Sequence, residues 1–319
     1  MNQIKQLAGQ TAVYGMGTIV PRLLNFAFLV PFYARTFESG GMGAITELYA
    51  YVVILNVIIT LGMETGFFRF SQDKSQFRSV YTTAFLIVSI LAILLIVFVR
   101  IFLNPIAAAI QYEDSKEFIT WFSLIIALDS ISAIPFAKLR RENRPRRFAT
   151  LKLINVGITI ALVFFCLKFW PAIVENNPET WFNSLYNPDL GVGYVFLSNL
   201  IASAIVFILL LPEYKLLGGP LSKKVFIDLL KYSLPLVIVG IAGSINDVAD
   251  KILLKFWFTG KGVVMKELGI YGVNFRLAVL MTLFVQMFKY AFEPFLFAQK
   301  KGDKTNAMYV LVMDVFVAI

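Results

Sequence analysis

Histidine is absent from this 319-residue chain, and cysteine occurs only once, at Cys166. Without histidine the chain lacks the commonest metal ligand and the commonest general base, which argues against a histidine-dependent enzyme. A single cysteine cannot form a disulfide within the chain, and its position in an apolar run predicts a small buried residue. We therefore expect no catalytic residue, no metal site and no cofactor.

Charged residues are also scarce, at 15% of the chain, whereas 58% of the residues are hydrophobic and the mean hydropathy is +0.75. These values lie outside the range of a soluble domain of this length. The hydrophobic residues form nine runs: 11–33, 45–68, 79–103, 118–137, 149–170, 191–211, 233–257, 270–297 and 307 to the end. Most are about twenty residues long, enough for a helix to cross ~30 Å of hydrocarbon. Because the runs are continuous rather than alternating, they predict an all-α polytopic membrane protein with about nine spans.

Lysine and arginine are unevenly distributed between the two predicted sides of the membrane. With a cytoplasmic N-terminus, 18 of the 29 are assigned to the cytoplasmic side, 8 to the opposite side and the remaining three, Arg22, Arg276 and Lys289, to the membrane interior. The segment KLRRENRPRRFATLK (138–152) alone carries seven of them. The positive-inside rule therefore predicts a cytoplasmic N-terminus. The net charge of +9 is explained by loops that face anionic membrane lipid, so we expect no nucleic-acid partner.

One polar connection divides the predicted spans into two lobes. The segment LPEYKLLGGPLSKKVFIDLLKY (211–232) combines a Gly-Gly-Pro breaker with a basic amphipathic stretch. It predicts an interfacial helix, or alternatively a solvated linker. We predict a six-helix lobe over 1–212, a linker over 213–232 and an incomplete second lobe over 233–319. The last run stops after about a dozen residues, fewer than a span needs, so we expect further helices of this lobe to be missing.

Several cationic side chains lie inside the runs, where burial is costly unless they face the bundle interior or a water-filled path. Arg22, Arg276 and Lys289 are of this kind, and Asn25 shares a helix face with Arg22. A guanidinium matches the oxygens of a carboxylate or phosphate. The four residues therefore predict a cationic, substrate-binding cavity. The alternative for Arg22 is a structural ion pair with an acid such as Glu47.

Acidic residues inside the runs form a second group, with a predicted role in ion coupling or gating. They are Glu47, Glu64, Asp129, Asp247, Asp250 and Glu293. Asp247 precedes Lys251 by four residues, which favours a local ion pair. Asp250 has no equally obvious partner and is the better candidate for coupling to a cation. The alternative for each acid is a purely structural hydrogen bond or ion pair.

Four segments carry a family resemblance: GQTAVYGMGTIVPRLLNF (9–26), ELYAYVVILNVIITLGMETGFFRF (47–70), SLPLVIVGIAGSINDVADKILL (233–254) and MTLFVQMFKYAFEPFLFAQ (281–299). They resemble the polysaccharide-biosynthesis flippases of the multidrug/oligosaccharidyl-lipid/polysaccharide superfamily, and most closely the bacterial oligosaccharide flippases. The resemblance runs along essentially the whole chain, and its dispersed apolar motifs indicate the family better than the substrate.

The resemblance implies two six-helix lobes around a central cavity that opens alternately to each side of the bacterial cytoplasmic membrane. It implies transport of an undecaprenyl-diphosphate-linked oligosaccharide to the outer leaflet, for O-antigen, capsule or exopolysaccharide. In such proteins cationic cavity residues are thought to meet the diphosphate and glycan, a role that Arg22, Arg276 and Lys289 fit. Related proteins commonly have about twelve to fourteen spans, more than are found in this chain.

Two other functions stay open on the sequence alone. A cation-coupled multidrug exporter of the same superfamily predicts an acid-dominated cavity, whereas acids and bases are mixed here. A membrane-embedded polysaccharide polymerase or glycosyltransferase predicts clustered catalytic groups in a long loop, but the loop 170–191 offers only Glu175, Glu179 and Asp189. No Walker-type loop supports an ATP-driven pump. The expected partners are the lipid-linked oligosaccharide, membrane lipid and a coupling Na⁺ or H⁺.

Overall fold

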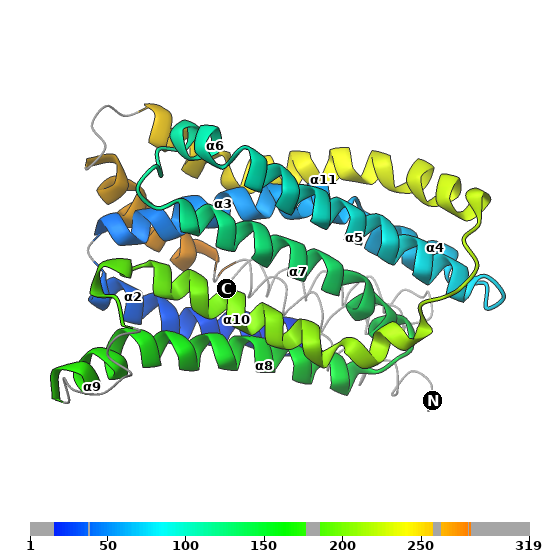
Figure 1. Ribbon diagram of the computed structural model, residues 1–319, viewed down its shortest axis with the longest axis horizontal. Coiled ribbons are helices and arrows are strands. Elements are labelled where there is room, and N and C mark those ends of the chain that lie inside the picture. Colours follow the sequence, from blue (N-terminus) through cyan, green and yellow to red (C-terminus); the bar gives the residue numbers. More distant parts are fainter. Residues whose placement is uncertain (1–15, 38, 177–185, 258–262, 280, 282–319) are drawn as a thin grey trace, which may run out of the picture.

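The computed structural model describes residues 16–37, 39–176, 186–257, 263–279 and 281. These residues form helices and short connections, with no strand in the part of the chain so described. The helices run side by side in an elongated bundle, and the connections lie at its two ends (Figure 1). The prediction of an all-α polytopic membrane protein is confirmed.

Six helical segments are long and apolar enough to cross a membrane: Met16–Thr36, Gly40–Phe70, Phe77–Ile101, Lys116–Arg141, Pro145–Asn176 and Lys223–Trp257. A further apolar helix, Gly193–Leu209, is shorter. Each of the first seven predicted runs thus coincides with a helix. A helix over 263–279 covers the first residues of the eighth predicted run, 270–297. Apart from Met281, the remainder of the eighth run and all of the ninth lie outside the described residues.

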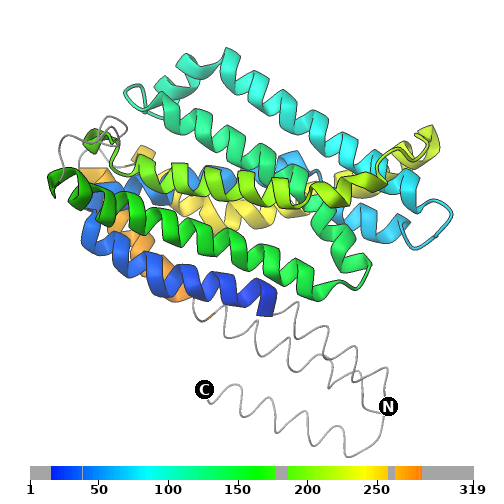
Figure 2. The same cartoon turned by 60° about the horizontal axis from the view of Figure 1, so that its bottom comes forward.

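The helices that carry the argument below are, in chain order, α2 (Val30–Thr36), α3 (Ser39–Thr60), α4 (Met63–Phe70), α5 (Phe77–Ile101), α6 (Leu103–Ala109), α7 (Lys116–Arg141), α8 (Pro145–Phe164), α9 (Trp170–Asn176), α10 (Gly193–Leu209) and α11 (Lys223–Trp257). The first and fifth spans each contain one π-helical turn, Asn25–Leu29 and Phe165–Phe169. Figure 2 shows α2, α8, α10 and α7 lying in that order across the bundle.

Helix α7 is the centre of the bundle, because it packs against α3, α5, α8 and α10. The N-terminal half of α7 joins an aromatic core in which the rings of Tyr49, Phe122 and Phe196 pack edge to face or tilted. By contrast, one face of α5 exposes large apolar side chains such as Ile93 and Phe98. Such a face suits contact with lipid rather than water. Cys166 is buried, as its apolar surroundings predicted.

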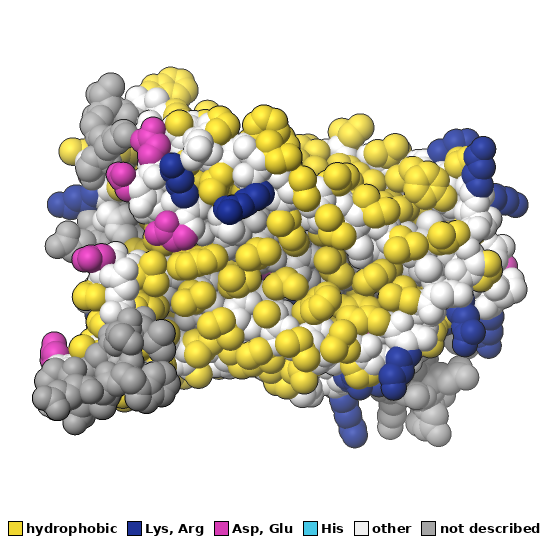
Figure 3. Space-filling model, in the orientation of Figure 1, with side chains coloured by type: hydrophobic (Ala, Val, Ile, Leu, Met, Phe, Trp, Pro, Cys, Tyr) yellow, Lys and Arg dark blue, Asp and Glu magenta, His cyan; other side chains and the backbone are white. Residues whose placement is uncertain are grey.

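Charged side chains gather at the two ends of the bundle, with an apolar band between them (Figure 3). Lys and Arg gather at the right-hand end of this view, and most of the Asp and Glu side chains in view lie at the left-hand end. The right-hand end holds the connections α4–α5, α7–α8 and α10–α11. We call it the inner end, following the positive-inside prediction, and the opposite end the outer end.

The connection before α11 differs from the prediction of a separate interfacial helix. Leu211–Leu216 form a 3₁₀ helix, and the amphipathic stretch 223–232 forms the first turns of α11, which continues for 35 residues. Two apolar side chains of this stretch are covered by protein: Val225 and Leu229 are buried in a cluster with Met63, Phe67 and Tyr81, whereas Phe226 is 43% exposed. One face of the stretch therefore packs against the bundle rather than against the membrane surface.

Glycines allow α11 and the helix that follows it to approach α3 closely. A Cβ atom on Gly240 would lie 2.8 Å from Cγ1 of Val57. At the outer end, a Cβ on Gly43 would overlap the carbonyl oxygen of Met265, and a Cβ on Gly272 would overlap the side chain of Thr46. Small residues at such contacts are a common device of helix packing in membranes, where dispersion rather than the hydrophobic effect drives association.

We predict that Gly43→Ala destabilises the protein by about 1–3 kcal/mol, because the new methyl group meets a backbone carbonyl that cannot rotate away. Gly40→Ala is the matched control: it lies three residues earlier on α3, and a Cβ there meets nothing within 4 Å. We expect that control to be neutral or stabilising by up to about 1 kcal/mol, because alanine has the higher helix propensity. Thermal unfolding in detergent measures both, and equal midpoints would contradict the close contact.

Candidate functional site

Glu47 on α3 is the most deeply buried charged residue among those the structure describes, with no exposed surface. Its partner is Lys255 on α11, whose Nζ lies 2.7 Å from Glu47 Oε1. The hydroxyl of Tyr112 donates to Oε2 at 3.0 Å, and the hydroxyl of Tyr51 donates to Oε1 at 3.2 Å. Lys255 also donates to the carbonyl oxygen of Ile110. This Glu47 cluster joins α3, α11 and the connection between α6 and α7.

The Glu47 cluster shows which base pairs with this carboxylate. Glu47 is an ion-pair partner, but its base is Lys255 rather than Arg22. A buried carboxylate requires a partner and hydrogen bonds to compensate its lost hydration. Here the lysine and two tyrosine hydroxyls provide both. The pair spans 208 positions of sequence, and Lys255 had been counted among the basic residues of the outer side.

A second set of charged residues lies on the first, second, fourth, fifth and eighth spans. We call it the polar track; its members are Arg22, Glu64, Asp129, Arg140, Lys152 and Arg276. Lys152 on α8 is the common neighbour, since it lies within electrostatic range of Asp129, Glu64, Arg140 and Arg22. The Nζ of Lys152 also sits 4.3 Å from the ring centroid of Phe136.

Asp129 occupies the middle of α7, and its side chain is exposed although this helix is the most buried of the spans. It lies beside Lys152 on α8 and Ser203 on α10. Tyr49 on α3 lies within electrostatic range of both Asp129 and Arg276, so it is a common neighbour of these two members of the polar track. Asn199 donates to the Tyr49 hydroxyl at 2.5 Å.

The cationic residues predicted for substrate binding are partly brought together. Arg22 and Asn25 are exposed on the first span, and Asn25 opens its π-helical turn. Arg276 is half-buried and lies within electrostatic range of Tyr33 and Tyr49. Arg22 and Arg276 therefore belong to one track but occupy different parts of it. Lys289 lies outside the described residues, as does Glu293 of the acidic group.

Glu64 pairs with Arg140 at the inner end of the polar track. The side chains are 39% and 35% exposed, so water screens their attraction and the pair contributes little stability by itself. The Arg140 guanidinium also stacks 4.9 Å from the ring centroid of Phe68. Glu64 and Arg140 thus lie in contact across α4 and α7 while staying accessible to water.

The pairing expected on the seventh span is wrong. Lys251 Nζ lies 3.1 Å from Asp250 Oδ1, and it donates to the backbone carbonyl of Asp247 at 2.6 Å rather than to the Asp247 carboxylate. Tyr271, on the next helix, donates its hydroxyl to Asp250. The lysine side chain folds back along its own helix, where it reaches a carbonyl and a carboxylate together. Asp250 is therefore a partnered acid, and the side chain of Asp247 is exposed.

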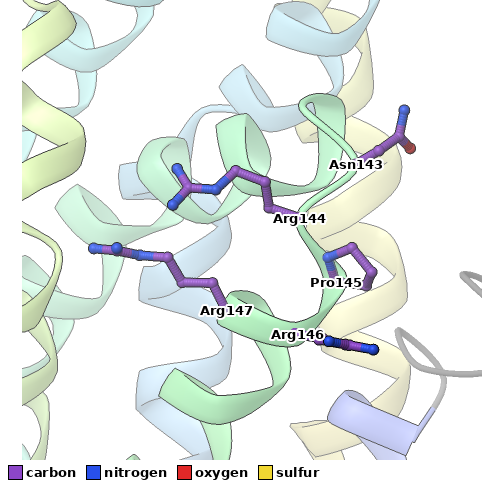
Figure 4. A pocket seen from close by; sticks show the side chains of 5 residues that line it. All are labelled: Asn143, Arg144, Pro145, Arg146 and Arg147. Atoms are coloured by element: carbon purple, nitrogen blue, oxygen red, sulfur yellow. The ribbon is translucent and has the colours of Figure 1, made fainter.

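At the inner end, Glu213 is 2% exposed and accepts contacts from three basic residues of the α7–α8 region. Lys138 Nζ lies 2.7 Å from Oε2, Arg144 Nη1 lies 3.1 Å from Oε1, and Arg147 Nε lies 3.0 Å from Oε1. Tyr81 donates to the Glu213 backbone oxygen at 3.1 Å. Figure 4 shows Arg144 and Arg147 extending to the same side of the turn, whereas Arg146 extends elsewhere.

The pKa of the Glu213 carboxyl is set by two opposing effects. Burial alone would raise this pKa, but the hydrogen bond from Lys138 and the charges of Lys138, Arg144 and Arg147 lower it overall. A carboxyl with a lowered pKa in the folded state stabilises the fold above its unfolded-state pKa. The stabilisation is lost as the pH falls through the lowered value. The Glu213 contacts are therefore intact at neutral pH.

Three charged residues of these clusters were not singled out in the sequence analysis: Lys152, Glu213 and Lys255. Lys152 was assigned to the cytoplasmic loop, although it already lies inside the fifth apolar run, and that position was the available signal. Glu213 could have been noticed as the lone acid between Asp189 and Asp228, opposite a strongly basic loop. Nothing in the sequence indicated that Lys255 pairs with Glu47. Within the described residues, no three His, Cys, Asp or Glu side chains are placed to hold a metal ion.

A family model described as polysaccharide biosynthesis protein matches residues 7–297 of the chain. The match covers the spans that carry the Glu47 cluster and the polar track. No curated protein and no solved structure matches the chain.

We predict that Glu213→Gln destabilises the protein by about 3–5 kcal/mol, because it leaves the buried Lys138 ammonium without its counter-charge. Glu142→Gln is the matched control: Glu142 contacts Lys138 and Arg144 only at 3.7 and 3.6 Å, and its side chain is 27% exposed. We expect that change to cost less than about 1 kcal/mol. Unfolding in detergent at neutral pH compares them, and a similar loss in both would refute the special role of Glu213.

Proposed function

The chain belongs to the polysaccharide biosynthesis protein family, and from this membership we propose that it is a flippase for a polyprenyl-diphosphate-linked oligosaccharide. It takes the lipid-linked repeat unit from the cytoplasmic leaflet of the bacterial inner membrane to the outer leaflet. There the unit is used for O-antigen, capsule or exopolysaccharide. The protein itself acts as a transporter and makes or breaks no glycosidic bond.

The polar track is the observation that carries this proposal. It places cations on four helices of an otherwise apolar bundle: Arg22, Arg140, Lys152 and Arg276. A diphosphate cannot enter a low-dielectric slab without compensation of its charge, whereas the polyprenyl tail is soluble in lipid. Arginine matches phosphate oxygens in a bidentate way, and lysine supplies a mobile point charge. Successive cations therefore lower the free energy of the headgroup along its path.

Two acids beside these four cations offset half of the positive charge of the empty track. Asp129 lies next to Lys152, and Glu64 pairs with Arg140. A diphosphate that binds Lys152 competes with Asp129 for the same ammonium. Asp129 is then available to bind H⁺ or Na⁺, which would couple transport to an ion gradient. Asp250, by contrast, has the partners Lys251 and Tyr271 in the described structure.

Uncharged polar groups beside the track suit the sugar part of the substrate. Ser130 donates to Asn56 Oδ1 at 3.1 Å, and Asn199 donates to Tyr49. Amides and hydroxyls of this kind donate and accept hydrogen bonds, as sugar hydroxyls do. In our proposal residues 1–212 form one lobe, residues 233–319 belong to the second, and rocking of the lobes exposes the track alternately to each side.

Deletion of the gene in its bacterial host tests the function directly. We expect complete repeat units to accumulate on the polyprenyl lipid in the inner leaflet and surface polysaccharide to be lost, as measured by mass spectrometry of extracted lipids and by surface staining. Single repeat units that still reach the surface would instead indicate a polymerase. An unchanged glycan profile with increased drug sensitivity would indicate a multidrug exporter.

The same deletion strain tests the polar track by complementation. We expect Arg22→Ala and Arg276→Ala to reduce surface polysaccharide at least about tenfold while the protein still inserts into the membrane, because each change removes a cation from the proposed path. Arg100→Ala is the control, since Arg100 is exposed in the last turn of α5, away from the track. Normal export by both track variants would remove the argument for a cationic path.

A further inference from the structure

The buried face of α11 changes character along the helix. Its buried residues follow one stripe at helical spacing: Val225, Leu229, Ser233, Val237, Ser244, Val248, Lys251 and Lys255. The inner half of the stripe is apolar or small, whereas the outer half ends in two lysines. Lysine is rarely buried without a specific partner. The two halves of α11 are therefore held to the rest of the protein by different forces.

The inner half of α11 is held by close apolar packing. Leu229 is fully buried in the cluster that contains Met63 and Phe67. A Cβ on Gly66 would lie 2.7 Å from Ser233 Oγ, so the two helices are nearly in backbone contact there. Dispersion contacts of this kind do not depend on the charge state of any group.

The outer half of α11 is held to α3 by charge. Lys255 is the residue of α11 that contacts Glu47, at 2.7 Å, and both side chains are at most 2% exposed. The other buried lysine, Lys251, takes its hydrogen-bond partners from α11 itself, the Asp250 carboxylate and the Asp247 carbonyl, and its Nζ lies 3.4 Å from the ring centroid of Phe275 on the next helix. Of these two lysines, Lys255 is therefore the one that forms an ion pair with α3.

Between the two halves, the helix contains residues that weaken it. Pro235 lies inside α11 and removes one backbone hydrogen bond, and Gly240 and Gly243 follow, residues whose intrinsic helix propensity is lower than that of alanine. Ile238 and Val239, between them, are 72% and 69% exposed. Kinks in long helices occur at such proline and glycine positions. The outer half can thus tilt while the inner half stays packed.

We propose that Lys255 is a positioning residue for transport: its ion pair with Glu47 holds the outer half of α11 against α3, and separation of the pair lets that half pivot near Pro235 and Gly240. The movement opens the outer end of the bundle between α3 and α11. The role of this movement in transport rests on the proposed flippase function. The contact itself is a property of the empty protein and needs no substrate to be tested.

Two single-cysteine reporters on the buried stripe measure the two halves separately. Cys166→Ser removes the one native thiol. Val248→Cys then reports on the outer half and Ser233→Cys on the inner half, since these residues are 5% and 0% exposed. The rate of maleimide labelling of the purified full chain in detergent follows the population in which each thiol is uncovered. Each reporter is combined with Lys255→Met, Lys255→Arg and Lys251→Met.

We expect Lys255→Met to raise the labelling rate of Val248→Cys about tenfold or more and that of Ser233→Cys less than about twofold. Lys255→Arg, which keeps the charge, and Lys251→Met, which leaves the Glu47 contact in place, should each stay within about twofold of the parent. Equal acceleration at both reporters would show general loosening and overturn the proposal. So would an unchanged rate at Val248→Cys, or Lys255→Arg behaving like Lys255→Met.

These outcomes are distinct from failure of the flippase function itself. Selective labelling together with an unchanged glycan profile in the deletion strain would leave the pivot of α11 intact and remove its assigned substrate. Glycan accumulation without selective labelling would support the flippase function and overturn the pivot of α11.

Discussion

Compensation of charge in an apolar surrounding is the constraint on which this structure depends. An ionised group that leaves water must find opposite charge and hydrogen bonds within the protein. Glu47 finds them in Lys255 and two tyrosines, and Glu213 finds them in three bases. Both sites join helices that lie far apart in sequence. The same requirement that makes these charges costly therefore also fixes which helices lie together.

The charged groups fall into two kinds according to their access to water. Glu47, Lys255, Lys138 and Glu213 are buried and paired, which suits a structural or positioning role. Asp129 and Arg22 are exposed although they belong to membrane-spanning helices, and Glu64 with Arg140 is half-exposed. Charges that stay accessible inside a bundle are the ones able to meet an incoming anion or cation. Solvent access, more than charge alone, separates the candidate transport residues from those that hold the helices.

The sequence was sufficient to predict the helices but not their partners. The hydropathy of a segment can be calculated from that segment alone, without knowledge of its neighbours in space. The seven predicted runs that begin the chain therefore coincide with helices. The stretch 223–232 was misread because its apolar residues Val225 and Leu229 are covered by Met63 and Phe67, which are about 160 residues away along the chain. Lys251 pairs with Asp250 rather than Asp247 for a similar reason. The lysine side chain folds back along its own helix, and Tyr271 of the next helix donates to Asp250. Spacing rules consider only one helix and ignore such neighbours.

The separation of Glu47 from Lys255 has a consequence for how the chain is made. Translation proceeds at roughly 5–20 residues per second, so the 208 residues between them take on the order of 10–40 seconds to synthesise. During that interval the second span has left the ribosome, but Lys255 has not yet been synthesised. Tyr112, 65 residues after Glu47, arrives much earlier and offers the carboxyl a first hydrogen bond. Until Lys255 is made, Glu47 lacks its counter-charge, so we expect the new span to hold this carboxyl near the aqueous boundary and to reach its final depth only after the seventh helix has been inserted.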